Sequence, residues 1–141
     1  MPVYITLVNV PAAAAATAAT LRERLMGVAG LSAADGLHAV GGDVDLYARL
    51  LSMLLDSDLP ARLSSELQAG HAAAGQQAAH TFKGVAATLG ANALRDQAAE
   101  IDHQLRALSE GAVPAALCEQ AERMLKDFEA LTAAIRAALQ S

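Results

Sequence analysis

Apolar residues recur at every third or fourth position along most of the chain, and this spacing predicts helices that each bury one face. The clearest set is Val44, Tyr47, Leu50, Leu51, Leu54 and Leu55. Further stripes predict helices over about 72–89, 92–108 and 115–139. Pro60 is expected to kink or restart the helix that begins near Val44. Apart from residues 3–8, no stretch alternates as a strand does, so the pattern predicts an all-α fold built on an antiparallel four-helix bundle with short connections.

Residues that favour helix starts and ends mark where the predicted helices begin and stop. Pro11 is a favourable first residue for a helix, so one or two extra helices are predicted before the bundle. Asp43 is expected to cap the first long helix, and Gly90 is expected to end the second. These breaks predict two parts: an N-terminal linker or arm with a helix over residues 1–31, and a four-helix-bundle domain over residues 32–141.

The amino-acid composition favours helices and argues against nucleic acid as a binding partner. Of the 141 residues, 54% are hydrophobic but only 3% are aromatic, and much of the apolar content is alanine, which favours close-packed helices over a sheet. A net charge of -5 without a basic cluster argues against binding to nucleic acid. The single cysteine, Cys118, excludes an internal disulfide and suits a reducing compartment, so a cytoplasmic location is expected.

The N-terminal stretch carries no charge before Arg22, yet it does not have the pattern of a membrane segment. Asn9 and Pro11 interrupt residues 3–20, about half of that stretch is alanine and threonine, and no basic residue precedes it. Neither a signal peptide nor a spanning helix is predicted, and no direct membrane contact is expected from this chain.

The helix predicted over 72–89 has an unusual outer face. Helical geometry places His80 opposite the large apolar residues, so the imidazole should face outward. The residues opposite it are Phe82, Val85, Ala86 and Leu89. The residues expected beside it are Gln76, Gln77, Lys83, Gly84, Ala87 and Ala91. Lys83 is the only formally charged side chain between Gly70 and Asn92, whereas the other helices carry many charges.

These residue types suit phosphoryl exchange with a docked protein. An exposed imidazole is mostly neutral, and therefore nucleophilic, near pH 7. Lys83, one turn from His80, could offset the negative charge of a phosphoryl group and orient its oxygens. Gly84 costs about 1 kcal/mol of helix propensity relative to alanine, and clearance for a partner is a reason to retain it. The secondary candidates for binding the phosphoryl group or the partner are Gln76, Gln77, Ala87 and Thr88.

An ordinary surface explains part of the same pattern, because an alanine-rich protein has alanine on every face and a lone surface histidine is common. His38, His71 and His103 are scattered without a metal-binding spacing, so no metal site is predicted. No phosphate loop of the form G-x-x-x-x-G-K-[ST] is present, so no nucleotide chemistry is expected. The methionines expected to fill the core are Met26, Met53 and Met124. The arginines expected to be surface charges are Arg22, Arg24, Arg95 and Arg106.

The stretch AHTFKGVAATLGANAL, residues 79–94, resembles the signature of histidine-containing phosphotransfer (HPt) domains. The stretch DGLHAVGGDVDLYARLL, residues 35–51, is similar to the family's entry into its first long helix, and the likeness extends over about residues 32–139. The resemblance implies that His80 is the phosphoacceptor, supported by Lys83 and Gly84. Two departures, Asp102 where glutamate is commoner and Phe82 where leucine is, are not expected to touch the chemistry.

The resemblance implies a phosphorelay intermediate. His80 would accept a phosphoryl group from an aspartate of a receiver domain and pass it to an aspartate of a response regulator. No cofactor is expected in this chain, and Mg²⁺ would belong to the partner receiver. The chain is expected to be a monomer, either a standalone relay or the C-terminal domain of a bacterial hybrid sensor kinase. The alternative is an HPt-like interaction module that binds a receiver or another partner without phosphotransfer.

Overall fold

The computed structural model describes residues 14–108 and 112–140. The helices within these ranges are α2 (Ala14–Leu25), α3 (Ala33–Ala39), α4 (Val44–Leu55), α5 (Leu59–Gln68), α6 (Ala72–Leu89), α7 (Asn92–Ala107) and α8 (Ala115–Gln140). No strand occurs within the described ranges, which confirms the predicted all-α class. The alternating stretch at residues 3–8 and the helix start expected at Pro11 lie outside them.

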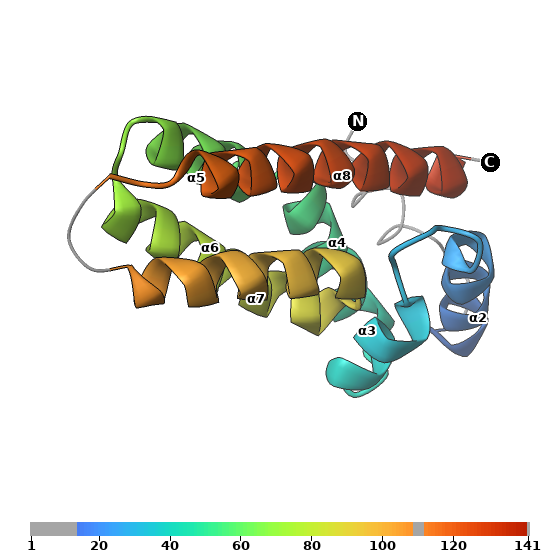
Figure 1. Ribbon diagram of the computed structural model, residues 1–141. Coiled ribbons are helices and arrows are strands. Elements are labelled where there is room, and N and C mark those ends of the chain that lie inside the picture. The colour runs from blue at the N-terminus through green and yellow to red at the C-terminus, as the bar shows by residue number, and fades with distance from the viewer. Residues whose placement is uncertain (1–13, 109–111, 141) are drawn as a thin grey trace.

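Helices α5 to α8 form the predicted four-helix bundle (Figure 1). α6 packs between α5 and α7, and α8 closes the bundle by packing on both α5 and α7. Phe82 of α6 and Phe128 of α8 meet edge to face, with ring centroids 5.7 Å apart. Other fully buried side chains of the bundle are Leu63, Leu67, Leu89, Ile101, Leu117 and Met124. The bundle therefore holds α6 by one face, and residues of the opposite face such as His80 and Gly84 are exposed.

The helix predicted to begin near Val44 is in fact two helices. α4 ends at Leu55, and α5 begins at Leu59 with Pro60 in its first turn, so Pro60 restarts the helix. Arg136 of α8 donates a hydrogen bond to the carbonyl oxygen of Leu55 at 3.0 Å and ties the end of α4 to the bundle. α4 lies outside the four bundle helices and packs against α6.

The N-terminal helix α2 is part of the same packed body as the bundle. It contacts α3, α4 and the end of α8 (Figure 1). Leu21 and Leu25 are buried in the common core, and Arg24 donates a hydrogen bond to the carbonyl oxygen of Leu139 at 3.1 Å. The helix predicted in the N-terminal part is therefore present, whereas a boundary between residues 31 and 32 stays a prediction.

Close contacts of α3 and α4 with the end of α6 fix the position of the helix that carries His80. The amide of Ser32 donates to the carbonyl oxygen of Gly90 at 2.7 Å, and the Tyr47 hydroxyl donates to that of Leu89 at 3.0 Å. Burial raises the pKa of Tyr47, so its hydroxyl remains a neutral donor. A Cβ on Gly36 would collide with the Tyr47 ring and the Leu89 carbonyl, so only glycine permits this approach.

The predicted helix ends are confirmed where a side chain or a left-handed backbone decides them. Asp43 accepts a hydrogen bond from the amide of Leu46 at 3.1 Å and caps α4. Gly90 ends α6 with φ 80°, the left-handed conformation that glycine adopts without strain.

The prediction for the methionines is right for one of three. Met124 is fully buried in the bundle. Met26 is 79% exposed because α2 ends one residue earlier, so helical spacing no longer applies to it. Met53 is 67% exposed because it lies on the side of α4 opposite the buried Leu51 and Leu54.

Candidate functional site

The orientation predicted for α6 is confirmed, since the side chain of His80 is 55% exposed. Phe82, Ala86 and Leu89 are buried on the opposite face, as expected. Val85 is only half-buried, because it lies at the margin of that face. Ala91, expected beside His80, is buried because α6 has already ended at Leu89. The ring of His80 therefore stands on the outer face of a helix whose inner face is locked into the core.

A buried carboxylate on the neighbouring helix lies directly beside this ring. Oδ2 of Asp102, on α7, is 3.4 Å from Nδ1 of His80. The same oxygen accepts a hydrogen bond from Nζ of Lys83 at 3.2 Å. The other oxygen, Oδ1, accepts from Nε2 of Gln76 at 2.7 Å and from Nε of Arg106 at 2.9 Å. Both oxygens of Asp102 thus hold two partners, and this set of five side chains is called the Asp102 cluster.

The environment of Asp102 keeps it ionised. Its side chain is only 4% exposed, and burial alone raises the pKa of a carboxyl group. The hydrogen bonds from Gln76, Arg106, Lys83 and His80 outweigh that effect and hold the pKa of Asp102 well below its usual range. A buried carboxylate with donors on both oxygens is a fixed negative charge beside the imidazole.

Two residues of α7 contact His80 in a way that the sequence did not predict. Asp102 was expected not to touch the chemistry, yet it contacts both His80 and Lys83. Arg106 was expected to be a surface charge and is 57% exposed, but its Nη2 also lies 3.3 Å from Nδ1 of His80. Reasoning about one helix at a time missed both, because the contacts run between α6 and α7. A signal was present: Asp102 follows Ile101 on the buried stripe of α7, where an acidic residue needs partners.

Of the other candidate residues predicted on α6, some belong to the Asp102 cluster and others lie outside it. Gln76 belongs to it through its bond to Asp102, whereas Gln77 is exposed and lies outside it. Lys83 belongs to it as well and is half-buried. Ala87 and Thr88 are exposed further along the helix, and the hydroxyl of Thr88 donates to the carbonyl oxygen of Gly84 at 3.0 Å. Two kinds of surface therefore flank His80, one charged and one small and neutral.

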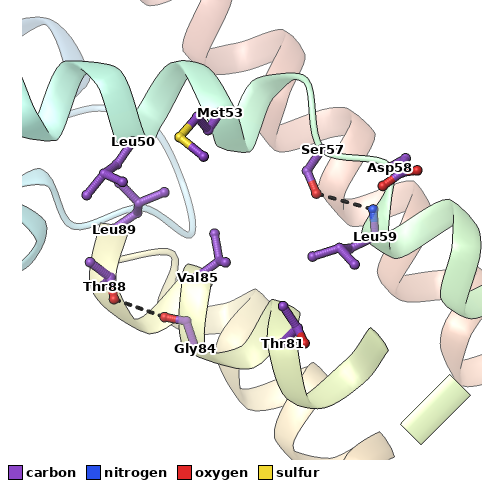
Figure 2. Close-up of a pocket in the computed structure, with 10 residues that line it drawn as sticks. All are labelled: Leu50, Met53, Ser57, Asp58, Leu59, Thr81, Gly84, Val85, Thr88 and Leu89. Atoms are coloured by element: carbon purple, nitrogen blue, oxygen red, sulfur yellow. Dashed lines mark hydrogen bonds between the residues drawn. The ribbon is translucent and has the colours of Figure 1, made fainter. Parts of the chain in front are cut away.

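The neutral side borders an apolar groove of about 610 Å³ between α6 and the α4–α5 corner (Figure 2). Gly84, Thr88 and Val85 line it from α6, and the side chains facing them are Leu50, Met53 and Leu59. A Cβ on Gly84 would meet no atom within 4 Å, so packing inside the protein does not require glycine there. At about 100° per residue, Gly84 lies between His80 and the groove, and Lys83 lies on the side of α7. His80 therefore lies between the other four side chains of the Asp102 cluster and the groove.

The remaining features of the ranges 14–108 and 112–140 concern metal binding, membrane spanning and the other histidines. They contain no group of three or more His, Cys, Asp or Glu side chains placed to hold a metal ion. No helix within them is long and apolar enough to cross a membrane. Of the remaining histidines, His71 pairs through Nδ1 with Oε2 of Glu66 at 2.9 Å, at the start of α6.

A family model described as the Hpt domain matches residues 49–140, about two thirds of the chain. The chain belongs to the Hpt domain family. The matched range includes all four bundle helices of this Hpt domain, and with them His80 and the whole Asp102 cluster. Searches of curated proteins and of solved structures returned no match. Hpt domains are histidine-containing carriers of phosphoryl groups and interact with receiver domains in phosphorelays, so the resemblance predicted from residues 79–94 is confirmed at the level of the family.

Proposed function

We propose that this Hpt domain is a phosphorelay intermediate in which His80 accepts a phosphoryl group from a receiver-domain aspartate and passes it to an aspartate of a response regulator. One observation carries the proposal: Nδ1 of the exposed ring faces a buried carboxylate, and no described residue makes a hydrogen bond to Nε2. The ring is thereby oriented from behind while its outer nitrogen is open to a partner.

The transfer needs no base beyond the ring itself. In the tautomer with the proton on Nδ1, Nε2 carries a lone pair and attacks the phosphorus atom of the donor. The N–P bond forms, the P–O bond to the receiver's aspartate breaks, and that carboxylate leaves with the electron pair. The ring becomes a cation whose Nδ1 proton lies beside Asp102, 3.4 Å away, and the carboxylate stabilises it. Transfer to the second receiver is the reverse of these steps.

Lys83 supplies the positive charge that an incoming phosphoryl group requires, and Arg106 is a second cation in the same cluster. The two cations and the one carboxylate of the Asp102 cluster give it a formal charge of about +1 before transfer. Lys83 is one turn from His80 and remains about one third exposed, so its ammonium can turn from Asp102 towards the phosphoryl oxygens. Arg106 would remain on Asp102 through its Nε.

The receiver docks over Gly84 and the apolar groove beside it. Gly84 lies between His80 and the groove, and its missing side chain leaves the approach to the ring clear. Met53 lines the groove and is 67% exposed. An exposed apolar side chain of this size is typical of a surface that binds a partner. A small apolar surface with a polar neighbour suits a transient partner better than a permanent one.

The proposal also covers cofactors, assembly and location. The domain holds no cofactor, the Mg²⁺ of the reaction resides in the receiver's acidic site, and the chain acts as a monomer in the cytoplasm. It serves either as a standalone relay or as the terminal domain of a hybrid sensor kinase.

The proposal is tested by incubation with a receiver that carries a radioactive phosphoryl group. The wild-type chain should gain label that is lost in acid and kept in base, His80→Gln should gain none, and Lys83→Ala should gain it more slowly. A matched control is His103→Gln, which removes an exposed histidine from α7 and should label like the wild type. Equal labelling of His80→Gln would show that another residue accepts the group. An unlabelled wild-type chain that still binds receivers would instead support an interaction module without phosphotransfer.

A further inference from the structure

Nδ1 of His80 has two neighbours of opposite character. Oδ2 of Asp102, an acceptor, lies 3.4 Å away, and Nη2 of Arg106, a donor, lies 3.3 Å away. A neutral imidazole has one N–H and one lone pair. When the proton is on Nδ1 it points to Asp102, and when the proton is on Nε2 the lone pair of Nδ1 accepts from Arg106. Each tautomer of the ring therefore has a partner at this nitrogen.

The two tautomers differ in reactivity at the open side of the ring. Only the Nδ1–H tautomer has a lone pair on Nε2, the nitrogen that a receiver can reach. The Nε2–H tautomer presents a proton there and cannot attack phosphorus. The relative strength of the hydrogen bonds that Nδ1 makes with Asp102 and with Arg106 therefore sets the fraction of His80 in the nucleophilic tautomer.

Arg106 is held where it can compete. Its Nε donates to Oδ1 of Asp102 at 2.9 Å from the next turn of the same helix, so the carboxylate positions the guanidinium. The planar group then carries Nη2 to the ring. The two distances at Nδ1 differ by only 0.1 Å (3.4 against 3.3 Å), so neither partner has a clear geometric advantage.

We propose that Arg106 is a positioning residue that restrains His80, because its hydrogen bond to Nδ1 maintains part of the ring in the unreactive Nε2–H tautomer. This inference rests on the proposed function, since a restraint matters only if His80 is the phosphoacceptor. Removal of Arg106 should release Nδ1 to Asp102 and make His80 a faster acceptor, even though it also removes a positive charge.

His71, the residue that precedes α6, offers an internal reference. Nδ1 of His71 lies 2.9 Å from Oε2 of Glu66, and among the described residues no cation contacts that nitrogen. His71 should therefore show the Nδ1–H tautomer in clear excess, whereas His80 should show both forms.

The test is a measurement of the ring tautomers by nitrogen-15 NMR on the whole chain, at about pH 8.5, well above the ordinary pKa of imidazole. His80→Gln assigns the signals. In Arg106→Ala the ratio of Nδ1–H to Nε2–H should rise at least about threefold at His80, as loss of one hydrogen bond predicts, and stay constant at His71. The rate of labelling by a phosphorylated receiver should rise with the Nδ1–H fraction, by about 1.5- to twofold from a starting ratio near one. Arg62→Ala, which removes another arginine paired four residues from an aspartate, should change neither.

The outcomes separate this inference from the proposed function. A His80 ratio that does not move in Arg106→Ala, or that moves together with a slower rate of labelling, overturns the role of Arg106 while labelling of the wild type still supports the relay. An unlabelled His80 in the wild type overturns the relay itself, whatever the tautomers do. A wild-type ring already in the Nδ1–H form alone, like that of His71, would show that Arg106 imposes no restraint.

Discussion

Gly75 and Gly84 occupy the same helix for opposite reasons. They are nine residues apart in α6, which at about 100° per residue places them on opposite faces. A Cβ on Gly75 would collide with the side chain of Leu67 on α5, whereas a Cβ on Gly84 would meet nothing within 4 Å. The inner glycine is needed for the close packing of α5 on α6. The outer glycine has no packing role inside the molecule, and its position beside His80 and the groove points to a role in access.

The difference shows how the fold and the function are divided between the two faces of α6. On the inner face, Phe82, Ala86 and Leu89 secure the helix in the core. On the outer face, His80 meets the solvent and a single buried group, Asp102, steadies it from α7. Changes on the inner face should therefore act on stability, and changes on the outer face on transfer.

The largest effect is expected from Gly84→Leu. A leucine at this place would stand between the approaching receiver and His80, and misplacement of reacting groups by about 1 Å can cost about 100-fold in rate. Transfer measured with a phosphorylated receiver should slow by about that factor, while the helical circular dichroism stays nearly unchanged and the unfolding midpoint does not fall below that of the wild type. Ala133→Leu, on an exposed position of α8, adds the same bulk elsewhere and should transfer normally. Normal transfer by Gly84→Leu would remove the clearance role of this glycine.

The second largest effect is expected from a change at Asp102, the buried carboxylate beside His80. Asp102→Asn removes a buried charge from three hydrogen-bonded donors besides the ring and should lower the free energy of unfolding at pH 7 by about 2 kcal/mol. Because folding lowers the pKa of Asp102, its contribution is fully present above the ordinary carboxyl value near 4 and is lost as the pH falls further.

The difference between wild type and Asp102→Asn should therefore shrink in urea titrations below about pH 4. Asp96→Asn, an exposed position on the same helix, is the matched control and should cost less than about 0.5 kcal/mol throughout. A deficit of Asp102→Asn that stays the same from pH 7 to pH 3 would contradict the ionised role of this carboxyl.

The third effect is expected from Gly75→Ala. The added methyl group must push the buried side chain of Leu67 out of its place, and overpacking of this kind costs about 1–3 kcal/mol. Denaturant unfolding should show the loss, while the folded fraction should still be labelled at the wild-type rate. Unchanged or increased stability would mean that α5 and α6 can move apart without cost.

The smallest effect is expected from Gly84→Ala. Since a Cβ there meets open space, alanine should stabilise the helix by about 0.5–1 kcal/mol through its better propensity. The sign is opposite to that of Gly75→Ala, so the two variants measured side by side test the comparison itself. If both variants changed the free energy of unfolding in the same direction, the contrast between Gly75 and Gly84 would be wrong.

Much of the fold was predictable because it rests on local patterns. The apolar stripes gave the bundle helices, and Asp43 and Gly90 marked their ends because capping and left-handed turns depend on single residue types. The fate of Pro60 was left open by the sequence, because a kinked helix and a restarted helix share one apolar spacing.

Only the part of the site that lies on α6 was predictable from the sequence. The outward direction of His80 and the nearness of Lys83 follow from α6 alone. Asp102 and Arg106 join them from α7, and the packing of one helix on another decides which turn faces which. The groove depends on how α4 and α5 meet, which places the exposed Met53 and Val85 along the same groove, and periodicity along one helix cannot predict this arrangement.

The most direct test of the account is the location of the phosphoryl group on the labelled chain. After transfer from a phosphorylated receiver to protein with nitrogen-15 in its histidine rings, NMR detection of the coupling between phosphorus and nitrogen identifies the bonded atom. The account predicts one phosphorylated ring, that of His80, bonded at Nε2 with Nδ1 still towards Asp102. A phosphoryl group on His38, His71 or His103, or on Nδ1 of His80, would contradict it.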